Sequence, residues 1–472
     1  MGSHFTEASC IKTLLSLLIL LVFSFITAEE EATQNEISKG SPVVYSKDEF
    51  VQKFIEATGL AEAYNAKIES AELDYDIVTA QYFPRLKLIF GIGPHPHYTY
   101  EKSAILPDGD DDGLPEVKES KWHKYYDNYG VAIRAKGEFV LPLYTFGKFR
   151  TGRNAAKAQI EVRRAEAEIA KLRIRKEAAF FYWSYVMAKS YFSILEPAME
   201  QLDKAEEKLK EMLFNGAEGV SQKHLKKLQI EKQKIQYQYE RLQYQTETLR
   251  EAISEVLGDN WELADTEMVQ QKFDKSLESL SENLKESSPQ LRYASGGLKA
   301  YESLYDLEFR KALPDFGIYG DYSFRYTSSV DETDNPNANS PYNGFDGEIG
   351  IGILFNLNIL EQARKIKKAK AEWNAVKAKV VFAEKNMPLQ LKQKFNDLKS
   401  LESHVAHMKQ IRKITKGVMT SEYSNYESGM TTDMKDLIDA VKDFFENEQA
   451  FIQAMFDYNM KVEEIIEFTG AE

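Results

Sequence analysis

Four stretches of the chain alternate apolar and polar residues with a period of two, the pattern of β-strands whose two faces meet different surroundings. Their apolar positions are Leu86, Leu88, Phe90 and Ile92; Val131, Ile133, Ala135, Phe139 and Leu141; Phe316, Ile318, Tyr322 and Phe324; and Ile349, Ile351, Ile353 and Phe355. Lys87, Lys136, Asp321 and Gly350 are among the residues between them. Each stretch has about the 9–11 residues that a tilted membrane-spanning strand needs. A soluble antiparallel sheet with one wet face would show the same alternation, so the pattern alone leaves both structures open.

Helix-forming sequence follows each pair of predicted strands and is too long for a compact domain. The first long helix is expected from about Thr151 to Phe214, with Pro197 inside it. The second is expected from about Glu361 to Ser428, with Pro388 and Gly417 inside it. At 1.5 Å per residue, a helix of about 60 residues extends roughly 90 Å. A second helix is expected to return after each, over residues 221–257 and 432–468.

Heptad spacing predicts that these helices pack side by side as coiled coils. One seam of the first returning helix is Leu228, Ile235, Leu242, Leu249 and Val256, and its companion is Leu225, Tyr239 and Ile253. The aromatic run from Phe180 to Tyr185 is expected to belong to the same packed core rather than to a ligand site, because bulky rings dominate helix packing.

The strands and helices occur twice, so the chain is interpreted as two copies of one unit. The residues that open the two long helices, Ala156 and Ala369, are 213 residues apart, and so are Asn215 and Ser428 just before the glycines that end them. The prolines that open the two β-hairpins, Pro84 and Pro314, are 230 residues apart. The first hairpin is therefore longer by 17 residues, which fall in a loop, where insertions are tolerated.

The N-terminal residues predict export. Lys12 precedes an apolar run, Leu14–Ile26, that ends in the small residue Ala28. This order predicts a secretory signal cleaved after Ala28, with an uncleaved anchor as the alternative. Cys10, the only cysteine, lies before the run, so neither a lipid anchor nor a disulfide is expected in the mature chain. The net charge of −14 argues against a nucleic-acid partner. If the mature chain crosses a membrane, it is expected to do so with strands.

No enzymatic motif is found in the sequence, which has neither a phosphate loop nor a nucleophile elbow. His95 and His97 flank Pro96 but lack a clear third metal ligand. The acidic loop at Asp108–Asp112 lacks the ligand spacing of a calcium-binding EF-hand. Exposed loop residues are therefore expected at both places, and neither an enzyme nor a cofactor nor a metal site is predicted.

Two segments resemble the TolC-type outer membrane efflux proteins, also called outer membrane factors. Val140–Lys148 is similar to the family's strand exit, a proline-containing apolar run ahead of a glycine, a basic residue and an Ala-rich helix. Tyr426–Gly429, Asp436–Ala440, Tyr458 and the closing Thr469-Gly470 follow the family's last hairpin in order and in approximate spacing. The sequence departs from the family in having one residue more between Gly429 and Ala440.

The resemblance implies an α+β membrane protein. Each chain would give four transmembrane β-strands to a shared trimeric 12-stranded β-barrel, continued by a long α-helical coiled-coil barrel. Four strands cannot close a barrel alone, since bacterial barrels start at about eight. The implied protein is a homotrimer of the bacterial outer membrane, with its helical part in the periplasm.

The implied partners are outer-membrane lipid, a periplasmic adaptor (membrane fusion) protein and an inner-membrane transporter. The implied function is a passive exit duct for a tripartite efflux or type I secretion system, gated at its periplasmic helical tips. The alternative is a soluble periplasmic coiled-coil adaptor or scaffold protein.

The resemblance also directs attention to the periplasmic ends of the two helical hairpins. Asp436 and Asp439 match acidic positions that ring the mouth, Asp433 lies three residues before them, and Tyr426 matches a tyrosine that holds the mouth closed. Acidic residues at a helix N-terminus also interact favourably with the helix dipole, so simple capping is the alternative. Small and apolar residues of the two turns are expected to contact the adaptor, namely Gly216, Val220, Gly429 and Met430.

The expected organisation is a signal peptide over residues 1–28, a first repeat over 29–258, a connecting segment over 259–288 and a second repeat over 289–472. The β-hairpins are expected at about 84–146 and 314–358, and the helical tips near 215–220 and 428–432. One early helix is expected over Lys47–Gln81.

Overall fold

A computed structural model describes residues 42–101, 104–106, 116–118, 121–216, 220–330, 342–355, 358–428 and 434–471. The chain divides into Met1–Val43, of which residues 42 and 43 are described, and Val44–Glu472, to which the following account refers. The expected signal peptide and the acidic loop at 108–112 lie outside the described residues.

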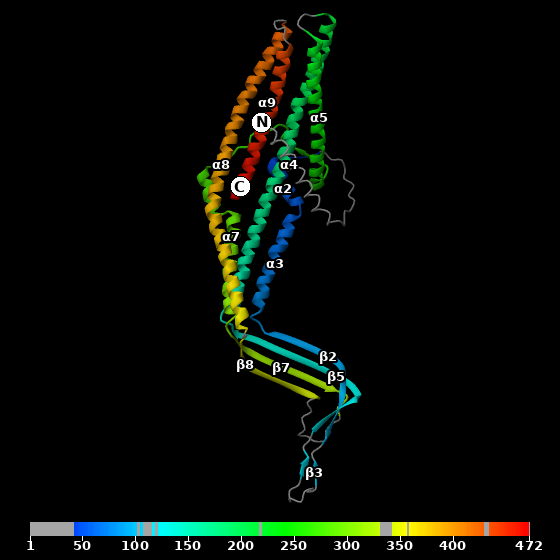
Figure 1. Cartoon of the computed structure of the whole chain (residues 1–472), viewed down its shortest axis with the longest axis vertical. Coiled ribbons are helices and arrows are strands. Elements are labelled where there is room, and N and C mark those ends of the chain that lie inside the picture. The colour runs from blue at the N-terminus through cyan, green and yellow to red at the C-terminus, as the bar shows by residue number, and fades with distance from the viewer. Residues whose placement is uncertain are drawn as a thin grey trace. The chain divides into compact units, whose positions relative to one another are not determined.

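A four-stranded antiparallel sheet is formed by the two predicted β-hairpins. Its strands are β2 (Arg85–Glu101), β5 (Lys121–Tyr144), β7 (Asp315–Thr327) and β8 (Gly344–Leu354), and they lie in the order β2-β5-β7-β8 (Figure 1). The first hairpin continues into the short strands β3 (Ala104–Leu106) and β4 (Glu116–Lys118). β2 has 17 residues and β5 has 24, more than the 9–11 expected, because the two strands keep pairing beyond the end of the second hairpin.

The register gives the sheet the two unlike faces that the alternation predicts. Leu88, Gly137, Tyr322 and Gly347 form one row across all four strands. The neighbouring row consists of charged residues, Lys87, Glu138, Asp321 and Glu348. On this polar face, side chains pair across the strands, as in Lys136 Nζ–Asp321 Oδ2 (3.8 Å) and Arg325 Nη2–Asp346 Oδ2 (3.0 Å). The apolar face has no such pairs to make, and Phe90, Ile92, Ile349 and Ile351 remain exposed on it.

Two long helices leave the sheet, α4 (Lys148–Phe214) after β5 and α8 (Ile359–Glu427) after β8. Gly147 takes a left-handed conformation (φ 79°) at the start of α4, where β5 turns into the helix. Each long helix is followed by a returning helix, α5 (Gln222–Leu257) or α9 (Met434–Thr469). Among the described helices, none has both the length and the apolar character needed to cross a membrane.

Shorter elements complete the fold: α2 (Lys47–Ala57), α3 (Leu60–Ala80), α6 (Leu277–Glu286), α7 (Pro289–Arg310), β1 (Val43–Tyr45) and β6 (Trp261–Leu263). The single helix expected over Lys47–Gln81 is two helices, because Gly59 lies between them in a left-handed conformation (φ 63°). The connecting segment contains β6 and α6, and Ala264 N–H at its start donates to Tyr45 O.

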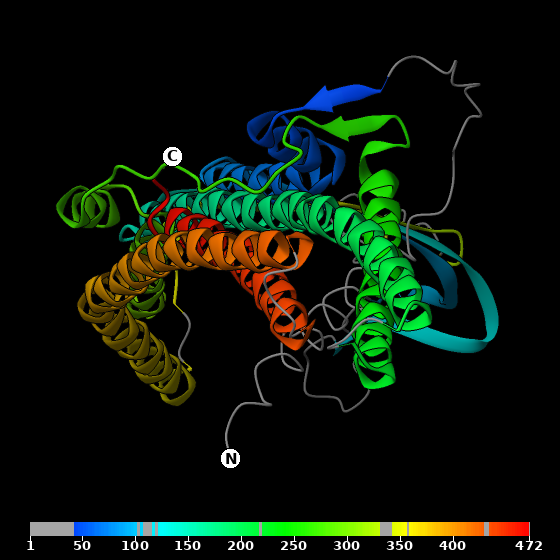
Figure 2. The same ribbon diagram turned by 90° about the horizontal axis from the view of Figure 1, so that it is seen from above.

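The helices keep the neighbour order of the strands. Next to the sheet, α3 packs on α4, α4 on α7 and α7 on α8, in the same order as β2-β5-β7-β8 (Figure 1). Farther from the sheet, α5 packs on α4, α4 on α9 and α9 on α8 (Figure 1). Figure 2 shows these helices from above. The described chain is thus a layer four elements wide, with β8 and α8 along one edge and β2, α3 and α5 along the other.

The main hydrophobic core lies where α2, α4 and α9 meet the connecting segment. Tyr182 and Trp183 of α4 are buried there, together with Phe50 of α2, Trp261 of β6 and Val462 of α9. This confirms that the aromatic run at Phe180–Tyr185 is core. The coiled-coil seams of α5 are confirmed by the burial of Leu225, Leu228 and Ile253.

We expect Gly347→Ala to lower the stability of the folded protein, because a Cβ at this position would lie 2.5 Å from the Tyr322 ring and 2.7 Å from Asp321 O. The cost should be about 1–3 kcal/mol, as for overpacking of a close-packed site. Gly350→Ala is the matched control, since a Cβ there meets nothing within 4 Å. Thermal unfolding in detergent should show a lower midpoint for Gly347→Ala alone, and equal midpoints would contradict the register.

Candidate functional site

The α4–α5 hairpin ends in a turn built around Gly216. Gly216 has a φ of 68°, the left-handed conformation common just after a helix, and its N–H donates to Leu213 O. Phe214, at the last position of α4, is 91% exposed. Val220 is half-buried against the apolar cluster described below, so it is less accessible than Phe214. Phe214 was not among the predicted site residues, because the glycine alone marks the end of the helix in the sequence.

The α8–α9 tip is described only in part. Gly429, Met430 and Asp433 lie outside the described residues. Tyr426 lies in the last turn of α8, and its side chain is likewise outside the description. The side chains of four of the eight predicted site residues are therefore not described. The described predicted residues at this tip are Asp436 and Asp439.

Asp436 and Asp439 are both exposed in the first turns of α9. Asp439 Oδ2 lies 4.0 Å from Lys435 Nζ on the same helix. Within the described part of the tips, Asp436 has no ion-pair partner. The two carboxylates are thus available to solvent or to another chain, and their position near the helix N-terminus also suits the helix dipole.

The residues between these aspartates join the two hairpins. Leu437 and Ile438 are buried in an apolar cluster with Leu202 and Leu209 of α4 and Leu225 and Leu228 of α5. Hydrophobic burial therefore holds α9 against the α4–α5 hairpin while Asp436 and Asp439 point elsewhere. We call this group the tip cluster.

A buried carboxylate ties α4 to α5 beside the tip cluster. Glu206 of α4 is 8% exposed and accepts hydrogen bonds from Gln229 Nε2 (3.0 Å) and Lys232 Nζ (2.8 Å) of α5. Lys210 Nζ lies 2.8 Å from the same carboxylate. The hydrogen bonds from Gln229, Lys210 and Lys232 lower the pKa of Glu206 to about 2. Lys232 also pairs with Asp203 at 2.6 Å, and the pKa of Lys232 is raised by its two acidic partners.

The α8–α9 hairpin has a comparable link. Arg412 Nε donates to Glu448 Oε1 at 2.5 Å, and Glu448 is 3% exposed. The guanidinium also lies over the Phe451 ring, 5.1 Å from its centroid. Each helical hairpin is therefore fastened internally by a buried carboxylate, and the tip cluster joins one hairpin to the other.

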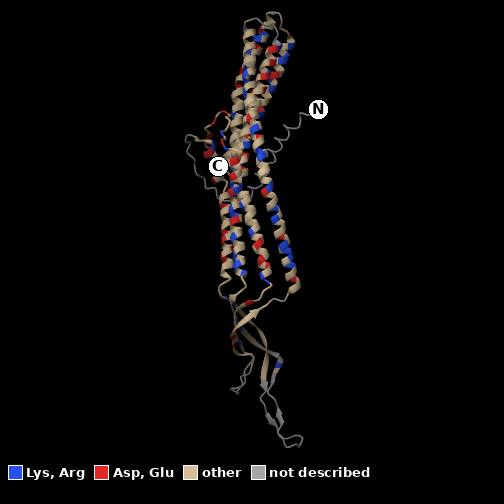
Figure 3. Ribbon diagram, turned by 90° about the vertical axis from the view of Figure 1, so that its left-hand side faces the viewer, with Lys and Arg blue, Asp and Glu red and all other residues tan. Residues whose placement is uncertain are grey.

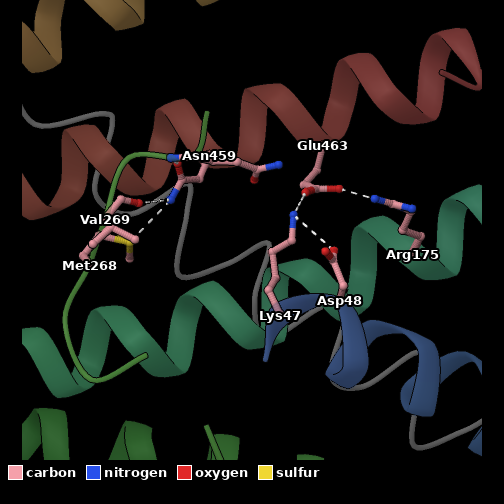
Figure 4. Close-up of polar contacts among 8 residues, drawn as sticks. Lys47, Asp48, Arg175, Met268, Val269, Asn459 and Glu463 are labelled. Atoms are coloured by element: carbon pink, nitrogen blue, oxygen red, sulfur yellow. Dashed lines mark hydrogen bonds and ion pairs between the residues drawn. The ribbon is translucent and has the colours of Figure 1, made fainter. Parts of the chain in front are cut away.

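A polar cluster in the C-terminal third of α9 holds α2 and the connecting segment in place (Figure 4). Glu463, 2% exposed, accepts from Lys47 Nζ of α2 at 2.8 Å and lies 3.7 Å from Arg175 Nε of α4. One turn away, Asn459 accepts from Gln271 N–H and donates to Val269 O, both at 2.8 Å. Asn459 Nδ2 also donates to Met268 Sδ at 3.7 Å, so backbone and side-chain groups together fix the connecting segment to α9.

Among the residues that the structure describes, no group of three or more His, Cys, Asp and Glu side chains is placed to hold a metal ion. The expectation of an exposed loop is wrong for His95, which is buried in β2 with its ring 5.2 Å from that of Tyr98 and 5.5 Å from that of Tyr342. The functional residues found here are those that position and join helices.

Comparisons with known proteins identify the fold. No family model matches the sequence, and no curated protein matches it. Among solved structures, the outer membrane protein VceC from Vibrio cholerae aligns with a TM-score of 0.68 and 13% identity, over 90% of this chain and 96% of that one. The CmeC outer membrane channel of Campylobacter jejuni aligns with a TM-score of 0.65 and 14% identity, over 94% and 93%.

The open state of the MtrE outer membrane channel of Neisseria gonorrhoeae gives a TM-score of 0.65 at 15% identity, over 94% of this chain and 96% of that one. The chain thus has the fold of these outer membrane channel proteins over nearly its full described length. The TolC-type fold that the sequence resemblance implied is confirmed.

We expect Glu206→Gln to destabilise the α4–α5 hairpin by about 1–3 kcal/mol at neutral pH, because two lysines and an amide lose a charged acceptor. The folded pKa of about 2 lies below the ordinary value of 4.5, so the charge of Glu206 stabilises the wild type fully above pH 4.5. That contribution is lost as the pH falls from 4.5 towards 2.

As the pH is lowered from 4.5 towards 2, the melting temperatures of the wild type and Glu206→Gln should therefore converge. Glu207→Gln is the matched control, since Glu207 is exposed and next in sequence. A melting temperature of Glu206→Gln equal to that of the wild type at neutral pH would contradict a stabilising role for the Glu206 carboxylate.

Proposed function

We propose that the chain is one subunit of a homotrimeric channel in the bacterial outer membrane, with its helices in the periplasm. The channel is the passive exit duct of a tripartite efflux or type I secretion system. The single observation that carries this is the sheet: four strands with one apolar face, one charged face and two edges that lack a strand partner in the described chain.

The two sheet edges support assembly into a ring. Four strands cannot form a closed barrel, and bacterial barrels start at about eight strands. If β2 of one copy pairs with β8 of the next, the contact joins two different surfaces and is head-to-tail. Such contacts close a ring when the rotation between copies fits. Three copies then supply 12 strands, and the helical layer of each copy follows its strands in the same order.

The apolar face supports contact with lipid. Ile351 is 81% exposed, and Phe90 and Ile92 are each 76% exposed. Exposed aromatic residues occur where each strand meets its helix: Phe83, Tyr144, Phe309 and Phe355. Aromatic belts of this kind mark the water boundary of membrane barrels. A soluble scaffold protein, the alternative, would leave this whole face in water.

The helical tips are the proposed docking and gating region. Phe214 and Gly216, with Val220, Gly429 and Met430, would contact a periplasmic adaptor that links the duct to an inner-membrane transporter. Asp436 and Asp439, with Asp433 and Tyr426, would close the mouth. The MtrE channel was solved in an open state, which supports opening as a property of channels with this fold.

The assembly is tested by fractionation and mass. The mature protein should sediment with the outer membrane, and its detergent-solubilised form should have the mass of three chains. Planar bilayers should then show conducting channels. A soluble monomer without conductance would exclude the duct and favour the scaffold.

Gating is tested by Asp436→Ala/Asp439→Ala. If the two carboxylates hold the mouth closed, the double variant should conduct several-fold more than the wild type and select less strongly for cations. If they serve the helix dipole alone, conductance should stay the same and stability should fall by about 1 kcal/mol. Asp443→Ala, an exposed aspartate farther along α9, is the control.

Adaptor contact is tested by Phe214→Ser. An aromatic side chain that is almost fully exposed on the isolated chain is the type of anchor that dominates protein interfaces, so its loss should weaken adaptor binding by about 2 kcal/mol or more. Trimer mass and single-channel conductance should remain unchanged. Adaptor binding equal to that of the wild type, measured with purified partners, would contradict the role of Phe214.

A further inference from the structure

Two helices border the layer next to the sheet, and they carry opposite charge. α3, on one edge, has the acidic residues Glu62, Glu69, Glu72, Asp74 and Asp76 against one basic residue, Lys67. The first five turns of α8, on the other edge, have Arg364, Lys365, Lys367, Lys368, Lys370 and Lys377 against Glu361 and Glu372. In Figure 3, Lys and Arg are blue and Asp and Glu red, and both colours appear on the helices near the sheet.

The unpaired charges of α3 lie on the side facing away from the rest of the chain. Ala71 is buried and Tyr75 OH accepts from Arg153 of α4 at 2.5 Å, which fixes the inner side of α3. Glu72 is paired with Arg164 at 2.7 Å. Glu62, Glu69 and Asp76 are exposed, recur every seven residues and have no ion-pair partner in the described part of the chain. We call this face, with the exposed Leu73 and Ile77, the α3 edge.

The basic residues of α8 are placed similarly. Ala369 is buried and the Trp373 ring stacks on Tyr305 of α7, with centroids 5.7 Å apart, which fixes the inner side of α8. Arg364 and Lys367 lie on the opposite side of the helix and Lys370 lies beside them, all three exposed. Among the described residues none of these three has an ion-pair partner, whereas Lys365 pairs with Glu361 at 2.7 Å. These three residues, with the small side chains Ala371, Ala375 and Ala378, form the α8 edge.

The two edges match in height above the sheet. α3 ends at Ala80, five residues before β2 begins at Arg85, and α8 begins at Ile359, five residues after β8 ends at Leu354. Asp76 is four residues from that end of α3, and Arg364 is five residues from the start of α8. Glu69 and Lys370 are each eleven residues from it, about 17 Å along the helix. Opposite charges therefore recur at the same levels on the two edges.

We infer that the α3 edge of one copy pairs with the α8 edge of the next, so that these charges select and orient the neighbour during assembly. This inference rests on the proposed trimer and adds the chemistry by which its subunits recognise one another. A partner of the wrong orientation would bring like charges together, which is costly.

Charge reversal tests the pairing. Arg364→Glu/Lys367→Glu/Lys370→Glu and Glu62→Lys/Glu69→Lys/Asp76→Lys should each weaken the trimer about tenfold or more in apparent dissociation constant, the size expected when exposed ion pairs become like-charge contacts. The variant that combines both sets should recover the trimer, because its edges are complementary again. Native mass spectrometry in detergent measures the three species.

Lys157→Glu/Lys171→Glu/Arg173→Glu is the matched control, with the same charge change on exposed residues of α4, in the middle of the layer. It should leave the trimer intact. Raising the salt from about 0.1 M to about 1 M shortens the screening length from about 10 Å to about 3 Å, so it should reduce the difference between the wild type and the single-edge variants.

The inference is overturned if the single-edge variants are as trimeric as the wild type, or if the combined variant fails to recover. A wild-type trimer whose α8-edge variant keeps its mass but shifts the reversal potential would place this face in the water-filled channel. A wild-type protein that is monomeric and does not conduct would instead refute the proposed function, which separates the two failures.

Discussion

Backbone hydrogen bonding is the constraint on which the rest of this structure depends. The sheet pairs each strand with its neighbours but leaves one side of β2 and one side of β8 without a ladder partner in the described chain. In hydrocarbon, each unsatisfied N–H or C=O costs several kcal/mol, so such a sheet is stable there only when other strands cover both sides. The helices keep the order of the strands because only a few residues join each helix to its strand, as between Tyr144 of β5 and Lys148 of α4.

Much of this fold could be predicted from the sequence, because the patterns involved are local. The two faces of the sheet follow from a period of two. Once the apolar face is assigned to one residue of a strand, such as Leu88 or Ile351, the face of every other residue in that strand is determined. The long helices follow from the scarcity of helix-breaking residues, and Gly216 ends α4 because it accepts a positive φ. The prediction of one helix over Lys47–Gln81 was wrong, because Gly59 divides it with a φ of 63°. The sequence shows the glycine but not the conformation that it adopts.

The candidate site was less predictable, since it depends on which helices become neighbours. Asp436 and Asp439 were found by their position near a helix start, yet nothing in their spacing showed that Leu437 and Ile438 between them would be buried against α4 and α5. Glu206 lies in a run of charged residues that resembles a solvated helix face. It is buried and joins α4 to α5 only because Lys232 of α5 packs against it. Contacts between residues more than twenty positions apart depend on how the helices pack against one another, which cannot be read from a single sequence.

The tip cluster has a thermodynamic consequence. Near the tips, Glu206 and Glu448 link the helices within each hairpin by ion pairs, whereas the tip cluster joins one hairpin to the other through apolar contacts of Leu437 and Ile438. Any motion that parts the hairpins exposes apolar surface to water, and such exposure raises the heat capacity. The separated state is then favoured by cooling, since apolar association weakens at low temperature. The contact between the two hairpins would therefore loosen in the cold while each hairpin stays intact.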